Sequence, residues 1–116
     1  MQYMILIYGN EAGYAAMSPE MHQQAMQAFI SYTQELAASG HMRAAGQLEG
    51  THTATTVRAP QGTVHTTDGP FAETKEQLGG YYVIEVPTLD DAIAWASKCP
   101  AVYGGAVEIR PLVPLQ

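Results

Sequence analysis

Apolar residues change from near-continuous runs to helical spacing along the first third of the chain. Residues 3–8 are almost wholly apolar and rich in aromatic and branched side chains, which predicts a central strand. Residues 10–17 then indicate a loop. The pair Ser18-Pro19 supplies a capping hydroxyl and a first-turn proline. Apolar residues follow at spacings of three and four and predict a helix to about Ser39, with Gly40 as its C-cap; they are Met21, Ala25, Phe29, Tyr32 and Leu36.

The middle of the chain predicts short extended segments separated by turns. Residues 42–48 form a second predicted strand, and residues 53–58 continue it after a break at Gly50. The sequence Pro60-Gln61-Gly62 has turn chemistry, and residues 63–67 alternate as a short strand. These segments predict a hairpin inserted into the chain.

The last third repeats the order of strand, helix and strand. Residues 81–86 form a strong apolar run that Pro87 ends. Residues 88–91 resemble a capping box with Asp at the third position, and a helix is expected to about Lys98. Residues 106–112 alternate apolar and charged side chains, which is typical of a final strand.

The resulting order is β-α-β-(β)-β-β-α-β in a single domain, residues 1–116. It predicts an α+β fold of the ferredoxin-like, split βαβ type with an inserted hairpin. Helices in such a fold cover one face of the sheet only. Because residues 3–8 and 81–86 are apolar on both sides, we expect a second subunit to cover the other face, in a homodimer.

Charge and cysteine content narrow the possible functions. The 116 residues include 11 Asp and Glu against 5 Lys and Arg, and the formal charge is −6. The few cations are scattered along the chain, which argues against a nucleic acid partner. A single cysteine, Cys99, excludes an intramolecular disulfide, and it is either a small packing residue or a thiol activated by Lys98. The apolar N-terminal run is too short for a signal or membrane segment, so we expect a cytoplasmic protein with no membrane association.

Residues 67–82 carry a long signature, TDGPFAETKEQLGGYY. This segment resembles the defining motif of the DGPF-domain proteins, a branch of the YCII-related family. The resemblance extends to residues 3–9, 54–58 and 105–111 and so covers essentially the whole chain. It implies a dimeric α/β-barrel type of fold, usually of unknown biochemical function, and a genomic setting beside extracytoplasmic-function sigma factors.

The wider family also includes members proposed to act through a histidine–aspartate pair. Their histidine stands in the first helix, about three turns before the glycine that ends it. That position falls near Phe29 in this chain, and the nearest histidine, His22, lies about two turns earlier. The histidine–aspartate pair of the family therefore does not carry over directly.

Asp68 is the best candidate for chemistry, with His22 as its possible catalytic companion. Asp68 stands at the end of a predicted strand and before Gly69-Pro70, so its carboxylate is expected on a stiff turn. Facing an apolar pocket lined by tyrosines, it would act as a general acid or base. The alternative is that Asp68 accepts hydrogen bonds from the backbone of its own turn.

Five further residues are candidate ligand contacts. Glu73 and Lys75 would form a polar rim for a small anionic or amphipathic ligand, or else a solvated loop. Tyr8 and Tyr82 lie on predicted central strands, where they would line a pocket or pack in a core or interface. Arg110 either pairs with Glu108 or Glu85 or holds a ligand carboxylate.

The four histidines lack metal-ligand spacing, so we expect neither a metal nor a cofactor. Two hypotheses stand. The first is a small-molecule-binding or accessory protein linked to sigma-factor regulation. The second is a cofactor-independent enzyme that uses Asp68 on a small polar substrate.

Overall fold

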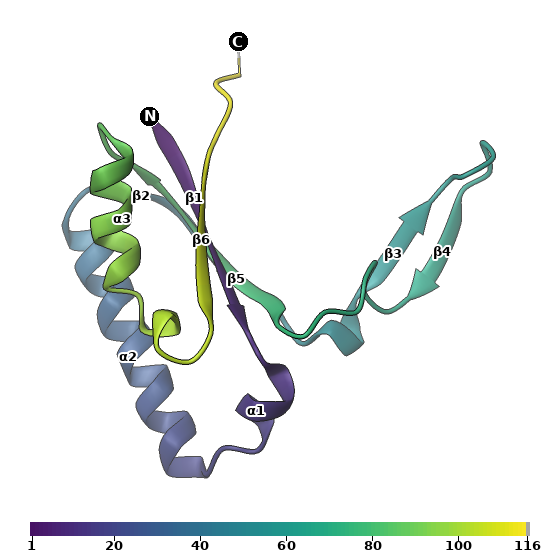
Figure 1. Cartoon of the computed structure of the whole chain (residues 1–116), viewed down its shortest axis with the longest axis horizontal. Coiled ribbons are helices and arrows are strands. Elements are labelled where there is room, and N and C mark those ends of the chain that lie inside the picture. Colours follow the sequence, from purple (N-terminus) through teal and green to yellow (C-terminus); the bar gives the residue numbers. More distant parts are fainter. Residues whose placement is uncertain (116) are drawn as a thin grey trace.

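The computed structural model describes residues 1–115 and shows a four-stranded antiparallel sheet with helices on one face (Figure 1). The strands are β1 (Gln2–Gly9), β2 (Met42–Gln47), β5 (Gln77–Glu85) and β6 (Ala106–Pro111), in the order β2-β5-β1-β6. The longer helices are α2 (Pro19–Ala38) and α3 (Leu89–Ser97). This arrangement confirms the predicted α+β, ferredoxin-like split βαβ fold.

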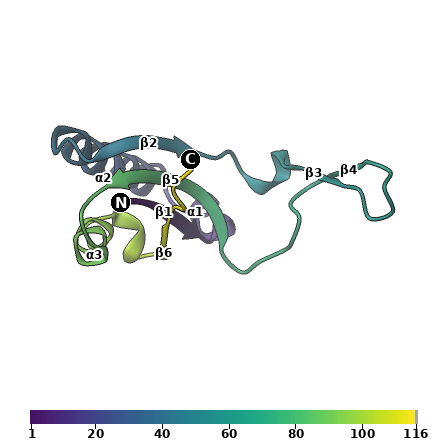
Figure 2. The same ribbon diagram turned by 90° about the horizontal axis from the view of Figure 1, so that it is seen from above.

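Between β2 and β5 the chain leaves the sheet and forms a separate hairpin. A short 3-10 turn, η1 (Thr51–Thr53), leads into β3 (Thr55–Arg58) and β4 (His65–Asp68), which pair only with each other. We call residues 54–71 the arm. In Figure 1 the arm rises on the side of the sheet opposite the helices, and Figure 2 shows it extending away from the body. The predicted inserted hairpin is therefore present, with strands shorter than expected.

The core lies between the sheet and the two longer helices. Alternate residues of β1 and β5 point toward the helices, where they pack against α2, α3 and the segment after α3. The most deeply buried side chains are Ile5, Leu36, Ile84 and Cys99. Burial raises the pKa of the Cys99 thiol, which makes this cysteine a packing residue in the protonated form.

One predicted loop contains a helix. Residues Glu11–Ala15 form α1, which begins at Asn10, where the side-chain Oδ1 accepts a hydrogen bond of 2.6 Å from the Gly13 N–H. Asn is among the favoured N-cap residues, and this cap stabilises a turn too short to show helical spacing. The prediction of a loop over residues 10–17 was therefore wrong for this segment.

The face of the sheet opposite the helices is open in the described chain. It carries alternate residues of β1 and β5, of which Met4, Leu6, Tyr81 and Val83 are half-buried, and no helix among residues 1–115 packs over it (Figure 1). We call it the open face. No helix in this range is long and apolar enough to cross a bilayer.

Replacing Leu36 tests the core. Leu36 is fully buried in α2, and Leu36→Ala is expected to lower the free energy of unfolding by about 2–5 kcal/mol because it leaves a cavity. Ile30 lies on the same helix with 42% of its surface exposed, so Ile30→Ala is a matched control with a change below about 1 kcal/mol. Urea unfolding at equal protein concentration measures both; equal losses would contradict this assignment of the core.

Candidate functional site

Two adjoining hollows lie where the arm meets the body. Their volumes are about 340 and 400 Å³, and they share five lining residues, Thr51, Pro70, Ala72, Thr74 and Gln77. The first is completed by His52, Gly69 and Glu73, the second by Tyr8, Phe71 and Leu78. We call the pair the arm-base hollow. It has a polar side and an apolar side, and in a single chain it is partly open to solvent.

The wall formed by the DGPF segment is held by backbone contacts at Gly69. This glycine has φ +102°, a conformation that residues with a Cβ rarely adopt. Its N–H donates to the Ala54 carbonyl at 2.7 Å, and its own carbonyl accepts from Thr56 Oγ1 at 2.8 Å. The turn after Asp68 is therefore fixed to the first strand of the arm.

The rest of that wall is tied to the start of α1. Asn10 Nδ2 donates to the Lys75 carbonyl at 3.2 Å, and the Glu11 N–H donates to Gln77 Oε1 at 2.9 Å. Gln77 Nε2 donates in turn to the Thr74 carbonyl at 2.6 Å. Two side chains, those of Asn10 and Gln77, thus join the loop to the start of the helix.

Glu11 fastens η1 to the same point. Its carboxylate accepts from the Thr51 N–H at 2.9 Å and from Thr51 Oγ1 at 2.7 Å. The sequence reasoning missed Glu11 and Thr51, because each is a polar residue in a segment with no period or motif of its own, and it also missed Gln77. For Gln77 one signal was present, its place inside the long signature.

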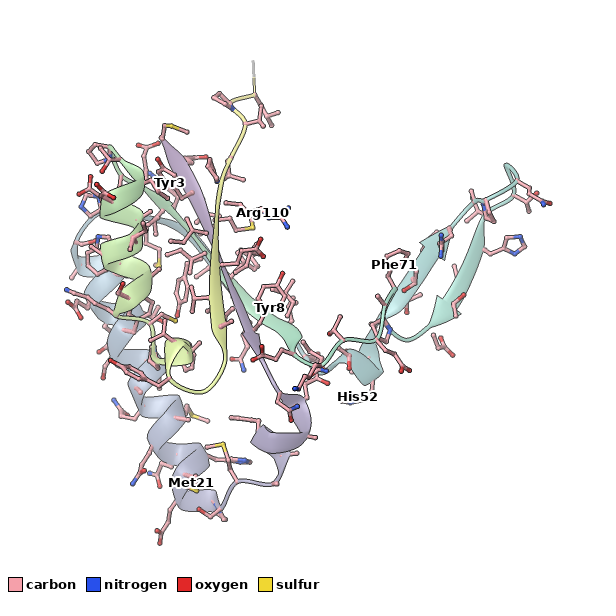
Figure 3. The ribbon with its side chains drawn as sticks, in the orientation of Figure 1. Tyr3, Tyr8, Met21, His52, Phe71 and Arg110 are labelled. Carbon is pink, nitrogen blue, oxygen red and sulfur yellow. The ribbon has the colours of Figure 1, made fainter. Side chains whose placement is uncertain are left out.

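A row of polar side chains crosses the open face toward the hollow. Tyr8 Oη donates to Glu108 Oε1 at 3.3 Å, and Arg110 Nε donates to Glu108 Oε2 at 2.8 Å. The hydrogen bond from Arg110 holds the pKa of the Glu108 carboxyl below its ordinary value, and Tyr8 adds to this effect. Figure 3 shows Tyr8 and Arg110 on the same side of the sheet. Of the two pairings predicted for Arg110, the one with Glu108 is present.

The predicted ligand contacts are partly brought together. Tyr8 lines the apolar side of the arm-base hollow and Glu73 the polar side. Lys75 contributes its backbone carbonyl to the contact with Asn10, and its side chain is exposed. Within residues 1–115, neither Glu73 nor Lys75 belongs to an ion pair.

Tyr82 does not line the hollow, and of the two roles predicted for it, lining a pocket or packing in a core, the structure has the second. Successive strand residues point to opposite faces, and the register pairs Tyr82 with Ile5, which faces the helices. Tyr82 is buried there, with its hydroxyl 2.6 Å from Thr33 Oγ1, and burial raises the pKa of the phenol. It is a core residue.

The two candidate catalytic residues lie apart within one chain. Asp68 is exposed at the end of β4, opposite Thr55. His22 lies near the start of α2, where its ring stacks on Tyr14 with centroids 4.6 Å apart and Nε2 lies 2.5 Å from the Tyr14 carbonyl. Figure 3 shows the neighbouring residue Met21 in the first turn of α2, far from the arm. Neither residue lines the hollow, and their catalytic roles stay predictions.

Metal ligands are likewise not assembled in the described part of the chain. No group of three His, Cys, Asp or Glu side chains lies close enough to hold an ion there. His65 is opposite Arg58 in the hairpin and His52 precedes it, so these two histidines do not meet across the strands.

An antiparallel sheet in this order, open on one face and with a hollow beside an inserted hairpin, defines an α+β protein of the ferredoxin-like class. The chain belongs to the YCII-related domain family, whose model matches residues 1–116. The family resemblance seen in the sequence is thereby confirmed.

Two known proteins are similar over nearly the full length. An uncharacterised protein of Rhizobium meliloti (strain 1021) is 34% identical over 114 residues, which cover 97% of this chain and 92% of the relative. The solved structure of 5-chloro-2-hydroxyhydroquinone dehydrochlorinase from Burkholderia phenoliruptrix AC1100, in complex with 2,5-dihydroxybenzoquinone, superposes with a TM-score of 0.58 at 13% identity. That match covers 97% of this chain and 94% of the other, and it shows a shared fold.

The pKa of Glu108 gives a test of the polar row. Because its folded-state pKa is lowered, the carboxylate keeps its charge as the pH falls past the ordinary value and takes up its proton only below it. Arg110→Gln is expected to move the midpoint upward, and Arg43→Gln, in the separate pair with Glu85, is expected to leave it unchanged. Carboxyl NMR titration measures both, and a midpoint insensitive to Arg110→Gln would disprove the coupling.

Proposed function

We propose that this chain is a small-molecule-binding protein whose site is the arm-base hollow. The observation that carries the proposal is the construction of that hollow. Its wall is the family signature, and the Asn10 side chain and the Glu11 N–H hold that wall by hydrogen bonds to Lys75 and Gln77, while the Glu11 carboxylate holds η1 beside it. Rigid support of a concave polar and apolar surface is what a binding site requires.

The ligand class follows from the lining. Tyr8, Phe71 and Leu78 offer apolar and aromatic contact on one side, and the hydroxyl of Tyr8 leads to Glu108 and Arg110. A small ring compound with hydroxyl or carbonyl oxygens matches this surface, because its ring packs on the aromatic side and its oxygens bind donors. The structural neighbour in complex with 2,5-dihydroxybenzoquinone supports the same class.

The open face supports a homodimer as part of the proposal. Half-buried apolar side chains such as Leu6 and Val83 form a continuous surface there, adjoining the hollow at Tyr8. A second copy placed against this face removes that surface from water.

Catalysis by Asp68 is the alternative, and the dehydrochlorinase activity in the neighbour's name favours it. In this version a substrate binds in the hollow, and Asp68 transfers a proton or assists hydrolysis. An accessory role beside a sigma factor is compatible with binding alone and rests on the family resemblance.

Binding of 2,5-dihydroxybenzoquinone tests the proposal. Calorimetric titration of the wild-type protein is expected to give saturable binding. Arg110→Gln is expected to weaken it by about tenfold, because Arg110 holds the Glu108 carboxylate that accepts the hydrogen bond of Tyr8 at the apolar side of the hollow. Lys98→Gln is the matched control, since Lys98 pairs with Glu35 on the helices, remote from the hollow. Equal affinity in all three proteins, or no binding of this probe and of related hydroxyquinones, would refute the proposed site.

The same samples separate binding from catalysis. Recovery of the unchanged probe after incubation, followed by mass spectrometry, supports a binding protein. Conversion that Asp68→Asn abolishes while the circular dichroism spectrum and probe affinity are retained supports the enzyme.

A further inference from the structure

We propose that the arm is an exchanged element: the arm of each chain packs on a second copy of this chain, and that copy closes the arm-base hollow. The inference deepens the proposed function, since it names the partner that completes the same site. It concerns residues 54–71 and the open face, which form the two sides of a V in Figure 1, with the hollow where they meet.

The arm lacks the burial that would hold it in place in a single chain. Its strands have four residues each, and seven of the eight are exposed. Three large apolar side chains, Val57, Val64 and Phe71, are exposed by 61%, 66% and 72%. A lone two-stranded hairpin is marginally stable in water, so this hairpin requires another surface to pack on.

Within its own chain, the arm makes few packing contacts with the body. The Arg58 guanidinium lies 5.0 Å from the centre of the Phe71 ring, a contact made inside the arm itself. The strands of the arm form a sheet separate from that of the body. Because no other strand among residues 1–115 pairs with them and their apolar side chains are exposed, these side chains are available to a partner.

The exposed area has the size that a second copy removes. The chain exposes 8187 Å², whereas a compact monomer of 12.5 kDa exposes about 6,200 Å². The radius of gyration is 16.1 Å, against about 13 Å for a compact chain of this length. The excess of about 2,000 Å² falls within the area that each chain of an obligate homodimer buries.

Charge favours a copy of the same chain over an oppositely charged partner. The arm carries one cation and one anion, Arg58 and Asp68. The sheet carries two ion pairs, Arg43–Glu85 and Arg110–Glu108, which are also neutral overall. Two chains of charge −6 therefore meet over surfaces without excess charge.

Shape also favours a second copy. A two-fold contact requires each surface to find its complement on an identical chain. Each chain offers both parts, an apolar open face and an apolar arm that stands off from it (Figure 1). A copy seated in the V meets both at once, and its own arm reaches back over the first chain.

The test compares two double variants by sedimentation velocity. The wild-type protein is expected at about 25 kDa, twice the chain mass of 12.5 kDa. V57E/V64E places charges on the arm, outside the hollow, and is expected to weaken dimerisation at least a hundredfold and give a 12.5 kDa species on dilution. M26E/I93E alters helix residues of comparable exposure, 58% and 45%, and is expected to remain a dimer.

Hydrogen exchange supplies the second readout, and circular dichroism verifies that each variant is folded. Amides of residues 55–58 and 65–68 are expected to be protected in the wild-type dimer and to exchange rapidly in V57E/V64E. Probe affinity should fall together with dimerisation, although neither substituted residue lines the hollow.

The outcomes separate the proposals. A V57E/V64E protein that dimerises as the wild type does, or a wild-type dimer with freely exchanging arm amides, overturns the arm exchange and leaves the sheet-face dimer standing. A wild-type monomer at all concentrations overturns both. The size measurement needs no ligand, so its failure is distinct from a failure to bind the quinone.

Discussion

One-sided burial of the central strand pair is the constraint from which the rest of the structure follows. In β1 and β5, Ile5 and Ile84 are fully buried against the helices, and Tyr3 and Tyr82 nearly so. Strand alternation then places Met4, Leu6 and Val83 on the opposite face, which no helix among residues 1–115 covers. The side chains on both faces of this sheet are apolar, but the helices cover only one face. The other face therefore stays exposed in a single chain. The site and the arm lie on the uncovered side.

Many residues of the long family signature hold the structure in place rather than face a ligand. Gly69 permits the turn at the base of the arm, Thr74 and Gln77 fix the loop that follows, and Tyr82 packs in the core. The motif spans the arm, the wall of the hollow and the strand that anchors both. A motif of this length is thereby explained by the need to hold one surface in place, whether or not its carboxylates react.

The fold was largely predictable from the sequence, and the site only in part. Continuous apolar runs and 3.6-residue spacing are strong signals, so the strand and helix order was right. Helix α1 was missed because one turn capped by Asn10 has no period to detect. The two roles left open for Tyr82, pocket lining and core packing, could not be separated from the sequence, because the face of a strand residue depends on the pairing register, here with Ile5. The contacts of Glu11 join residues 40 and 66 positions apart, which no local pattern encodes.

The few contacts that attach the arm to the body also set its orientation. Asn10 and Glu11 hold both chain segments that enter and leave the arm, and the ring stack of Tyr14 on His22 holds this short helix to α2. This single turn of helix thus attaches a hairpin that pairs with no other strand among residues 1–115. A slight rotation at Asn10 is magnified along the length of the hairpin. The angle at which the arm meets another molecule is therefore set by a few hydrogen bonds and one ring stack around α1.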